Sequence, residues 1–231
     1  MPKKDRAIIC LDRVSKNYKE YGMEVKALDN ISLKIYPGEF VSIVGPSGCG
    51  KSTLLHCMGV LDRPSSGVVY IDGKDTSKIS GREVALFRGE KLGFVFQSYN
   101  LIPRMSVLEN IMLPGLIMEK KFAKVEKRAY NLLIEVNLSH RIHHKGIHLS
   151  GGEKQKAAIA RALINEPMLV LADEPTGALD SKNSAEIMNV LTNMNEKKHS
   201  TFVFVSHDRN IAEYGKRTIT LKDGRIVGDK K

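Results

Sequence analysis

The chain has 231 residues, 42% of them hydrophobic, and its 36 lysines and arginines against 26 acids give a net charge of +10. Three cysteines without metal-ligand spacing indicate a reducing compartment, and no apolar run approaches the roughly 20 residues that a membrane-spanning helix needs. The length suits one large domain or two small ones, and we expect one domain with a lobe. Because Met1–Asp5 is not followed by the apolar core of a signal peptide, we expect a soluble, cytoplasmic chain.

The positive charge is carried by lysines scattered along the whole chain. Such an excess attracts anionic partners without naming one, so nucleic acid, a charged membrane face and nucleotides all fit. A scattered excess is most often an ordinary solvated surface. The charge alone therefore assigns no partner.

The first forty residues have the pattern of antiparallel strands. Apolar and polar residues alternate over 31–35, as in a strand with one buried face, and 8–14 holds a second apolar run. Tyr18 falls between them in a polar stretch, 16–21, that we expect to be a loop. An aromatic ring just outside a nucleotide site can stack on adenine, although a tyrosine taken alone is more often a surface residue.

A glycine-rich stretch follows a short apolar strand, Phe40–Val44, and fits the phosphate-binding pattern G-x-x-x-x-G-K-[ST] over Gly45–Ser52. The glycines let the backbone wrap a phosphate, and the helix that starts here directs N–H groups at the anion. We expect Lys51 to contact the β- and γ-phosphates and Ser52 to ligate Mg²⁺. The alternative is a chance match of a common turn, which the strand before it and the helix after it disfavour.

Two more strands are indicated by β-branched and aromatic runs. One covers 68–71 and enters a turn at Asp72-Gly73, and the other covers 93–96. Gln97 stands at the end of the second strand.

From 98 to 165 the pattern becomes helical. A capping box, Ser106–Glu109, opens one helix, and apolar residues at spacings of three and four over 125–136 indicate a second, after a charged loop at 119–121. The run Leu149–Gln155 then has a serine and two glycines that open a third helix, which continues through 157–163. A helix N-terminus without bulky side chains is a second candidate phosphate contact, although an ordinary glycine-softened helix start fits the pattern equally well.

A continuous apolar run, Met168–Ala172, ends in two adjacent acids, Asp173 and Glu174. Such a run is typical of a central parallel strand, and open α/β sheets bind ligands beyond the carboxyl ends of those strands. We expect Asp173 to be a direct or second-sphere ligand of Mg²⁺, and Glu174 to face the water that attacks the γ-phosphate. The alternative is a pair of solvated acids that cap the next turn.

The remaining pattern completes an α/β chain. A helix with an apolar stripe over 187–194 precedes a strand at 201–205, and a hairpin over 218–227 closes the sequence. His207 follows the strand, where it can donate a hydrogen bond to a γ-phosphate, although a lone histidine is more often structural.

Six elements in this order resemble the ATP-binding cassette (ABC) ATPases over essentially the whole chain, and the LSGG run is the discriminating one because other phosphate-loop NTPases lack it. The resemblance implies an α/β fold: a P-loop NTPase (RecA-like) core with an antiparallel β subdomain, formed by 1–97 and 166–231, and an inserted α-helical subdomain, 98–165. These parts make up a single domain, 1–231.

The resemblance also implies the site residues and the cofactors, ATP and Mg²⁺. Nucleotide-binding residues are Tyr18, Gly45, Pro46, Ser47, Gly48, Cys49, Gly50, Lys51, Ser52, Thr53, Ser150, Gly151, Gly152 and Asp180. Metal-binding residues are Ser52, Gln97 and Asp173. Catalytic residues are Lys51, Gln97, Glu174 as the base and His207 as the switch histidine.

In such ATPases two copies pack head to tail, so the resemblance implies a homodimer with ATP sandwiched at the interface. Ser150 and Gly152 of one copy would close on a γ-phosphate held by Lys51 of the other, and hydrolysis would open the dimer. The expected partner is an integral membrane permease docked near 99–103, with the chain held at the inner face of the cell membrane. No nucleic acid is expected.

The segments 92–103 and 175–181 look like the macrolide-exporter and lipoprotein-release branch, which implies export or extraction of a peptide, lipoprotein or drug. Two alternatives are a cassette that signals to a cell-wall or cell-division membrane partner, and a soluble cassette that acts on DNA or ribosomes. One departure is that Glu153, Lys154 and Lys156 stand where the family usually has glutamines and then arginine. Lysine lacks the bidentate fork of arginine, so contacts made there should be weaker or differently aimed.

Overall fold

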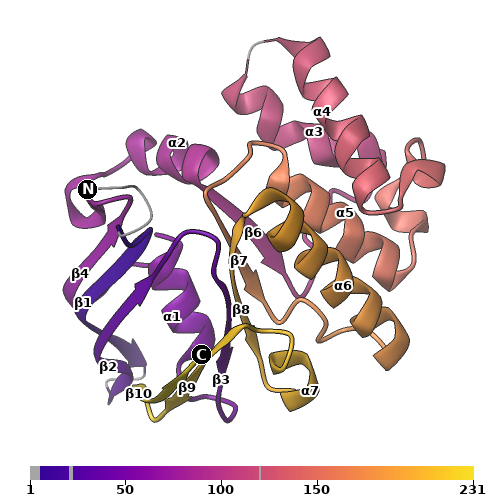
Figure 1. Ribbon diagram of the computed structural model, residues 1–231. Coiled ribbons are helices and arrows are strands. Elements are labelled where there is room, and N and C mark those ends of the chain that lie inside the picture. Colours follow the sequence, from indigo (N-terminus) through magenta and orange to yellow (C-terminus); the bar gives the residue numbers. More distant parts are fainter. Residues whose placement is uncertain (1–5, 21–22, 120) are drawn as a thin grey trace.

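The computed structural model describes residues 6–20, 23–119 and 121–231. The N-terminal residues Met1–Asp5, together with Tyr21 and Lys120 of the two expected loops, lie outside the described residues. A six-stranded sheet in the order β10-β9-β3-β8-β7-β6 runs through the centre (Figure 1). Its first strand, β10, is antiparallel to β9, and all the other pairs are parallel. The strands are β3 Phe40–Val44, β6 Leu92–Phe96, β7 Leu169–Asp173, β8 Thr201–Ser206, β9 Arg217–Lys222 and β10 Arg225–Lys230.

Each face of this sheet carries its own hydrophobic cluster. Every residue of β8 is buried, and successive side chains of a strand point to opposite faces. Val203 and Val205 accordingly join a cluster with helix α1 (Lys51–Met58) and the smaller sheet, whereas Phe202 and Phe204 join one with the helices of the other face. A strand buried on both faces explains why its sequence is a continuous apolar run.

The smaller sheet is antiparallel, in the order β2-β1-β4-β5, as expected. Its strands are β1 Ile9–Glu20, β2 Met23–Ile35, β4 Ser66–Ile71 and β5 Lys74–Asp75. The expectation that Tyr18 lies in a loop is wrong, because β1 continues through the polar residues and Tyr18 pairs with Val25. Pairing between strands satisfies the hydrogen bonds of the backbone N–H and C=O groups whatever the side chains are. The exposed end of a hairpin can therefore be a strand without an alternating apolar pattern.

The segment between β6 and β7 is helical, as expected. It contains α3 Val107–Met118, α4 Phe122–Glu135 and α5 Gly151–Leu163, with short 3₁₀ helices η3 Ser139–Arg141 and η4 Gly146–His148. The predicted capping box is present, since Ser106 accepts from the N–H of Glu109 and the Glu109 carboxylate accepts from Ser106. The third helix begins at Gly151 with Ser150 as its N-cap, so the serine and the two glycines open it as expected. α6 Ser181–Lys198 carries the predicted apolar stripe of the C-terminal part.

Two helices were not predicted. In α2, Arg82–Lys91, Phe87 is the buried side chain, so the segment shows no apolar stripe, and α7, Arg209–Ala212, is a single turn. A 3₁₀ helix, η2 Thr76–Lys78, leads toward α2. Within the described ranges, none of the helices combines the length and the apolar character required to cross a bilayer.

Candidate functional site

The loop between β3 and α1 has a backbone that requires glycine. Gly45, Gly48 and Gly50 have φ values of +157°, +77° and +100°. A Cβ on Gly50 would lie 2.3 Å from the carbonyl oxygen of Ala27, so a side chain is excluded there. No side chain caps the N-terminus of α1. The first N–H groups of α1 therefore have no side-chain partner in this turn, which leaves them able to donate to an anion.

Lys51 is 7% exposed and folds back over this loop. Its Nζ donates to the carbonyl oxygens of Gly45 and Pro46, each at 2.9 Å. These bonds use two of the three N–H donors of the ammonium group and hold its charge at the loop. The ammonium is thus placed where a bound phosphate would neutralise it.

The carboxyl ends of the parallel strands place Asp173 beside α1. Ser52 Oγ donates to Asp173 Oδ1 at 3.0 Å, and His56 Nε2 lies 3.8 Å from Asp173 Oδ2. Burial and the charge of Glu174 raise the pKa of Asp173 above its ordinary value, although the bond from Ser52 opposes this. A hydroxyl and a carboxylate are hard oxygen ligands of the kind that Mg²⁺ prefers, and Mg²⁺ takes few of them because it keeps waters and phosphate oxygens. The residues therefore fit the predicted metal.

The raised pKa of Asp173 leads to a prediction on stability. Because the folded chain binds this proton more tightly than the unfolded chain, ionisation at neutral pH costs stability. Asp173→Asn is therefore expected to raise the thermal unfolding midpoint of the ligand-free chain at pH 7 and to abolish Mg²⁺-dependent nucleotide binding. The gain should shrink toward pH 3, where the carboxyl is protonated in both states. Glu213→Gln, which removes an exposed acid of the segment after α7, is the control in thermal melts.

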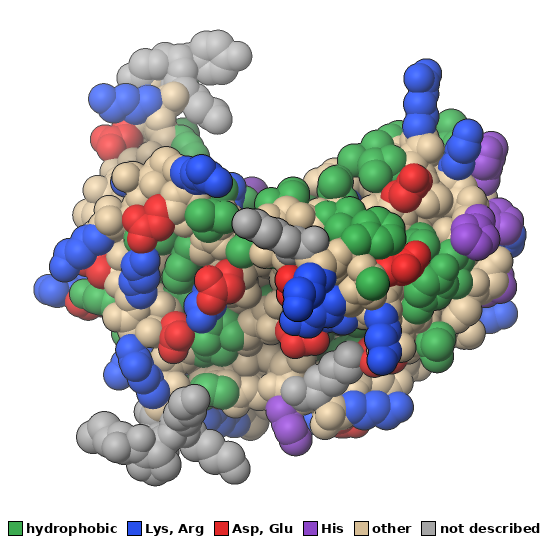
Figure 2. All heavy atoms as spheres, turned by 90° about the horizontal axis from the view of Figure 1, so that it is seen from above, with side chains coloured by type: hydrophobic (Ala, Val, Ile, Leu, Met, Phe, Trp, Pro, Cys, Tyr) green, Lys and Arg blue, Asp and Glu red, His purple; other side chains and the backbone are tan. Residues whose placement is uncertain are grey.

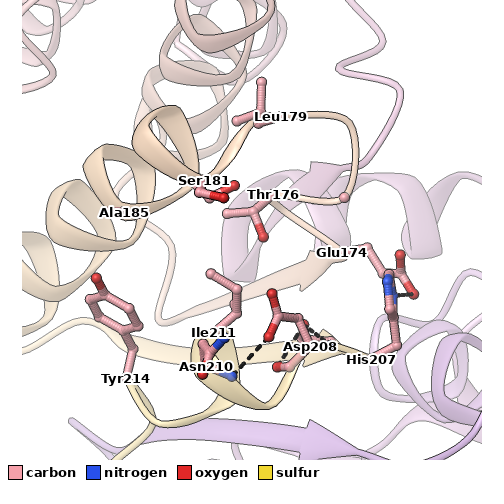
Figure 3. Close-up of a pocket in the computed structure, with 13 residues that line it drawn as sticks. Glu174, Thr176, Leu179, Ser181, Ala185, His207, Asp208, Asn210, Ile211 and Tyr214 are labelled. Atoms are coloured by element: carbon pink, nitrogen blue, oxygen red, sulfur yellow. Dashed lines mark hydrogen bonds and ion pairs between the residues drawn. The ribbon is translucent and has the colours of Figure 1, made fainter.

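The structure brings Glu174, His207 and Gln97 together. His207 Nδ1 lies 3.1 Å from Glu174 Oε1 (Figure 3). Glu174 has a φ of +45°, in the left-handed backbone region that residues other than glycine rarely adopt. It begins a turn in which the N–H of Gly177 donates to the Glu174 carbonyl oxygen. A Cβ on Gly177 would lie 2.9 Å from Glu174 Oε2 and 2.8 Å from Gln97 Nε2, so glycine is what lets both side chains converge.

A cavity of about 300 Å³ adjoins this cluster (Figure 3). The turn after Glu174 and the start of α6 form one side, and the segment from Ser206 to α7 forms the other. It is lined by Glu174, Thr176, Gly177, Leu179, Ser181, Ser184, Ala185, Ser206, His207, Asp208, Asn210, Ile211 and Tyr214.

The LSGG segment forms the N-terminus of α5. Ser150 Oγ accepts from the Glu153 N–H at 3.3 Å, Glu153 Oε2 accepts from the Ser150 N–H at 2.8 Å, and Arg141 Nε donates to Glu153 Oε1 at 2.8 Å. Burial opposes ionisation of Glu153, but its bonds with Ser150 and Arg141 prevail and lower its pKa to about 2. Glu153 thus caps this helix as an anion. The sequence showed only that a glutamate stands where the family usually has glutamine, and did not predict this role.

Lys156 and Gly152 of α5 lie against the first turns of α6. Asp180 caps α6 by accepting from the Asn183 N–H at 2.8 Å, and a Cβ on Gly152 would lie 2.9 Å from Asn183 Oδ1. Lys156 Nζ forms a 2.6 Å ion pair with Glu186. Lys156, which stands where the family usually has arginine, therefore forms part of the contact between α5 and α6.

Two site features escaped sequence reasoning because they depend on partners distant in the chain. Arg161 of α5 donates to the carbonyl oxygens of Asn100 and, at 2.7 Å, Tyr99, both in the segment after Gln97. Those two residues have φ values of +50° and +61°. The Tyr18 hydroxyl donates to Asp62 Oδ2 at 2.7 Å, just beyond the C-terminus of α1.

Comparison with known proteins adds an independent finding. Residues 28–177 match the family described as ABC transporter. The chain is 48% identical over 228 residues to the uncharacterized ABC transporter ATP-binding protein MJ0796 of Methanocaldococcus jannaschii, covering 97% of each chain. It is 46% identical over 215 residues to the lipoprotein-releasing system ATP-binding protein LolD of Aquifex aeolicus, covering 93% of this chain and 96% of LolD. It is 43% identical to the macrolide export ATP-binding/permease protein MacB of Marinobacter nauticus, but covers only 35% of that protein.

Solved structures give the same result. A dimeric structure of the MJ0796 cassette matches with a TM-score of 0.89 and 46% identity, covering 96% of this chain and 98% of that one. A second structure of that cassette, with the same TM-score and 45% identity, is a dimer in a post-hydrolysis state bound to ADP and Pi. The structure of cbiO1 from Clostridium perfringens, part of the ABC transporter complex cbiONQ, matches with a TM-score of 0.86 and 30% identity over 97% of this chain and 88% of that one.

Proposed function

The chain belongs to the ABC transporter family and is an ATP-binding ATPase of the ABC fold, and on that premise we propose that two copies bind ATP head to tail and drive a separate membrane permease. The observation that carries this proposal is the placement of the two helix N-termini to which we assign phosphate binding. Lys51 begins α1, whose apolar residues pack on one face of the main sheet, whereas Ser150 caps α5, whose apolar residues pack on the other. A γ-phosphate held by both would join two copies of the chain.

The site residues have distinct roles in this proposal. Lys51 and the loop N–H groups bind the phosphates, Ser52 and Asp173 hold Mg²⁺ with Gln97 beside it, and Tyr18 stacks on the base. Glu174 accepts a proton from the attacking water, and His207, which contacts Glu174, holds that carboxylate in place and donates toward the γ-phosphate. Mg²⁺, when bound, neutralises charge on the β- and γ-phosphate oxygens.

A permease partner is supported by the upper face of the molecule. Hydrophobic side chains gather there on both sides of a hollow (Figure 2). Exposed apolar residues include Leu116 and Ile117 at the end of α3 and Phe122 at the start of α4. Exposed apolar surface is typical of protein contacts. The helical subdomain 98–165 would carry the motion of the dimer to a partner at this face, and the chain would lie at the inner face of the membrane.

The transported substance is proposed from the relatives. MacB is named for macrolide export and LolD for lipoprotein release, and this chain aligns with about a third of MacB, whose name joins ATP-binding and permease. We therefore propose export or extraction of a peptide, lipoprotein or drug through a membrane permease.

Mixing two inactive variants tests the shared site. Lys51→Ala breaks the phosphate loop and Ser150→Phe blocks the start of α5, so each homodimer has two broken sites. In a head-to-tail mixed dimer both defects fall in one site and the other is intact. ATPase activity should therefore reappear on mixing, toward about a quarter of wild type, because half the dimers are mixed and half their sites are intact. A site built within one chain would show no recovery at any ratio.

The capping carboxylate of Glu153 gives a further prediction. Glu153→Gln keeps a side chain that can complete the capping box but removes a negative charge beside Ser150, where the partner's γ-phosphate would bind. ATP-dependent self-association should strengthen by about threefold, as expected for removing one partly screened charge. Glu109→Gln is a matched control because it makes the same change in the capping box of α3. Equal effects of the two substitutions in sedimentation would contradict the proposed position of the phosphate.

A further inference from the structure

Three side chains form a closed polar network where β1 meets the segment after α1. Asp62 accepts on both carboxylate oxygens, from Lys16 Nζ at 2.6 Å and from the Tyr18 hydroxyl at 2.7 Å. Lys16 Nζ also lies over the Tyr18 ring, 4.8 Å from its centroid. Each member therefore contacts the other two.

This network differs from an ordinary surface ion pair. The side chain of Lys16 is only 12% exposed, and its Nζ also donates to the Arg63 carbonyl oxygen at 2.8 Å. Surface ion pairs contribute little to stability because their side chains remain mobile in water. The largely buried ammonium of Lys16, in contrast, has three fixed contacts and is held in one geometry. Burial would raise the pKa of Asp62, yet the bonds from Lys16 and Tyr18 keep it below its ordinary value.

The backbone around the network is irregular on both sides. The pairing of β1 with β2 shifts register on either side of Lys16, and such bulges re-aim side chains. The opposite segment begins at Val60, whose φ of +53° is rare for a β-branched residue. It is fastened to β1 where Ser65 N donates to the Ser15 carbonyl oxygen and Asn17 N donates to Ser65 Oγ. Strain that persists at a site is a reason to look for function there.

We propose that Lys16 and Asp62 are positioning residues for the nucleotide base, which hold the Tyr18 ring in the orientation that the base stacks on. The inference rests on the proposed stacking role of Tyr18. The hydrogen-bonded ammonium covers one face of the ring, so a base stacks on the opposite face. Asp62 fixes the hydroxyl end, which keeps the ring from turning. A ring fixed before binding loses less conformational freedom when the base arrives, and base affinity rises accordingly.

The test separates the base from the phosphates by comparing ATP with inorganic tripolyphosphate, both with Mg²⁺. Lys16→Met and Asp62→Leu should each weaken ATP binding by about three- to tenfold, part of what a whole base–aromatic stack contributes, while tripolyphosphate affinity stays within about twofold of wild type. Leucine is similar in size to aspartate but accepts no hydrogen bond from the Tyr18 hydroxyl. Tyr18→Phe keeps the ring and removes the same bond, so it should match Asp62→Leu, and combining the two should add little.

Lys19→Met is the charge control, since Lys19 is an exposed lysine of the same strand. If Lys16→Met and Asp62→Leu bind ATP like wild type while Tyr18→Ala does not, the inference fails and the stacking proposal stands. If Tyr18→Ala also binds ATP normally, the stacking proposal fails and the inference falls with it. Equal loss of ATP and tripolyphosphate would mean that the substitutions disturb the phosphate loop, which also overturns the inference.

Discussion

Lys51→Ala should reduce ATP affinity by about two orders of magnitude and bring ATP hydrolysis below detection. The ammonium is buried and fixed at the phosphate loop through the carbonyl oxygens of Gly45 and Pro46, so its charge already lies at the site before ATP binds. A charge-assisted hydrogen bond contributes about 1.5–3 kcal/mol, and two phosphates would lose their bonds together. Binding of a fluorescent ATP analogue and release of phosphate measure the two effects.

Charge alone should not rescue this variant. Lys51→Arg keeps the positive charge, but the planar guanidinium cannot place a single nitrogen between the two loop carbonyls as Nζ does. We expect it to remain far below wild type, whereas Lys19→Ala, which removes an exposed lysine of β1, should hydrolyse ATP normally. Normal turnover by Lys51→Ala would refute the assignment of Gly45–Ser52 as the phosphate loop.

Sequence reasoning succeeded where a structure is encoded by neighbours in the chain. The strand, glycine turn and helix over 40–58 are one such case, because the three are contiguous. The capping box at Ser106 and the buried strand β7 are others. In each, a few adjacent residues carry both the hydrogen-bonding pattern and the apolar pattern.

Sequence reasoning failed where partners come from distant segments. Tyr18 was placed in a loop because its neighbours are polar, but pairing with β2 determines its conformation. Arg161 contacts a carbonyl 62 residues away, and nothing near either residue signals that bond. Helix α2 was missed because a helix with Phe87 as its buried side chain has no apolar period to detect.

The contact between Glu174 and His207 was also outside the reach of the sequence, although both residues were predicted to act in the site. They lie 33 positions apart, at the ends of neighbouring strands β7 and β8. The sheet topology brings the strand ends together, and the positive φ of Glu174 turns its side chain toward the histidine. A carboxylate held by a strained turn and a histidine would lose little freedom on binding a water molecule.

That geometry determines what Glu174→Gln should do. Glutamine has the size of glutamate and can keep a hydrogen bond to His207 Nδ1, so the turn should persist and ATP should bind as in wild type. It cannot accept the proton of the attacking water, so turnover should fall by about 10²- to 10⁴-fold. ATP would then survive between the two copies. Light scattering with size exclusion should show a dimer with ATP and a monomer with ADP.

A second substitution identifies what holds that dimer together. If the γ-phosphate joins Lys51 of one copy to the α5 N-terminus of the other, adding Lys51→Ala to Glu174→Gln should dissolve the dimer at ATP concentrations that saturate Glu174→Gln alone. A dimer that persists in the double variant would be held by protein contacts alone. Wild-type turnover in Glu174→Gln would instead remove Glu174 as the base. The two failures are distinct, because one concerns the force that closes the dimer and the other the proton transfer that opens it.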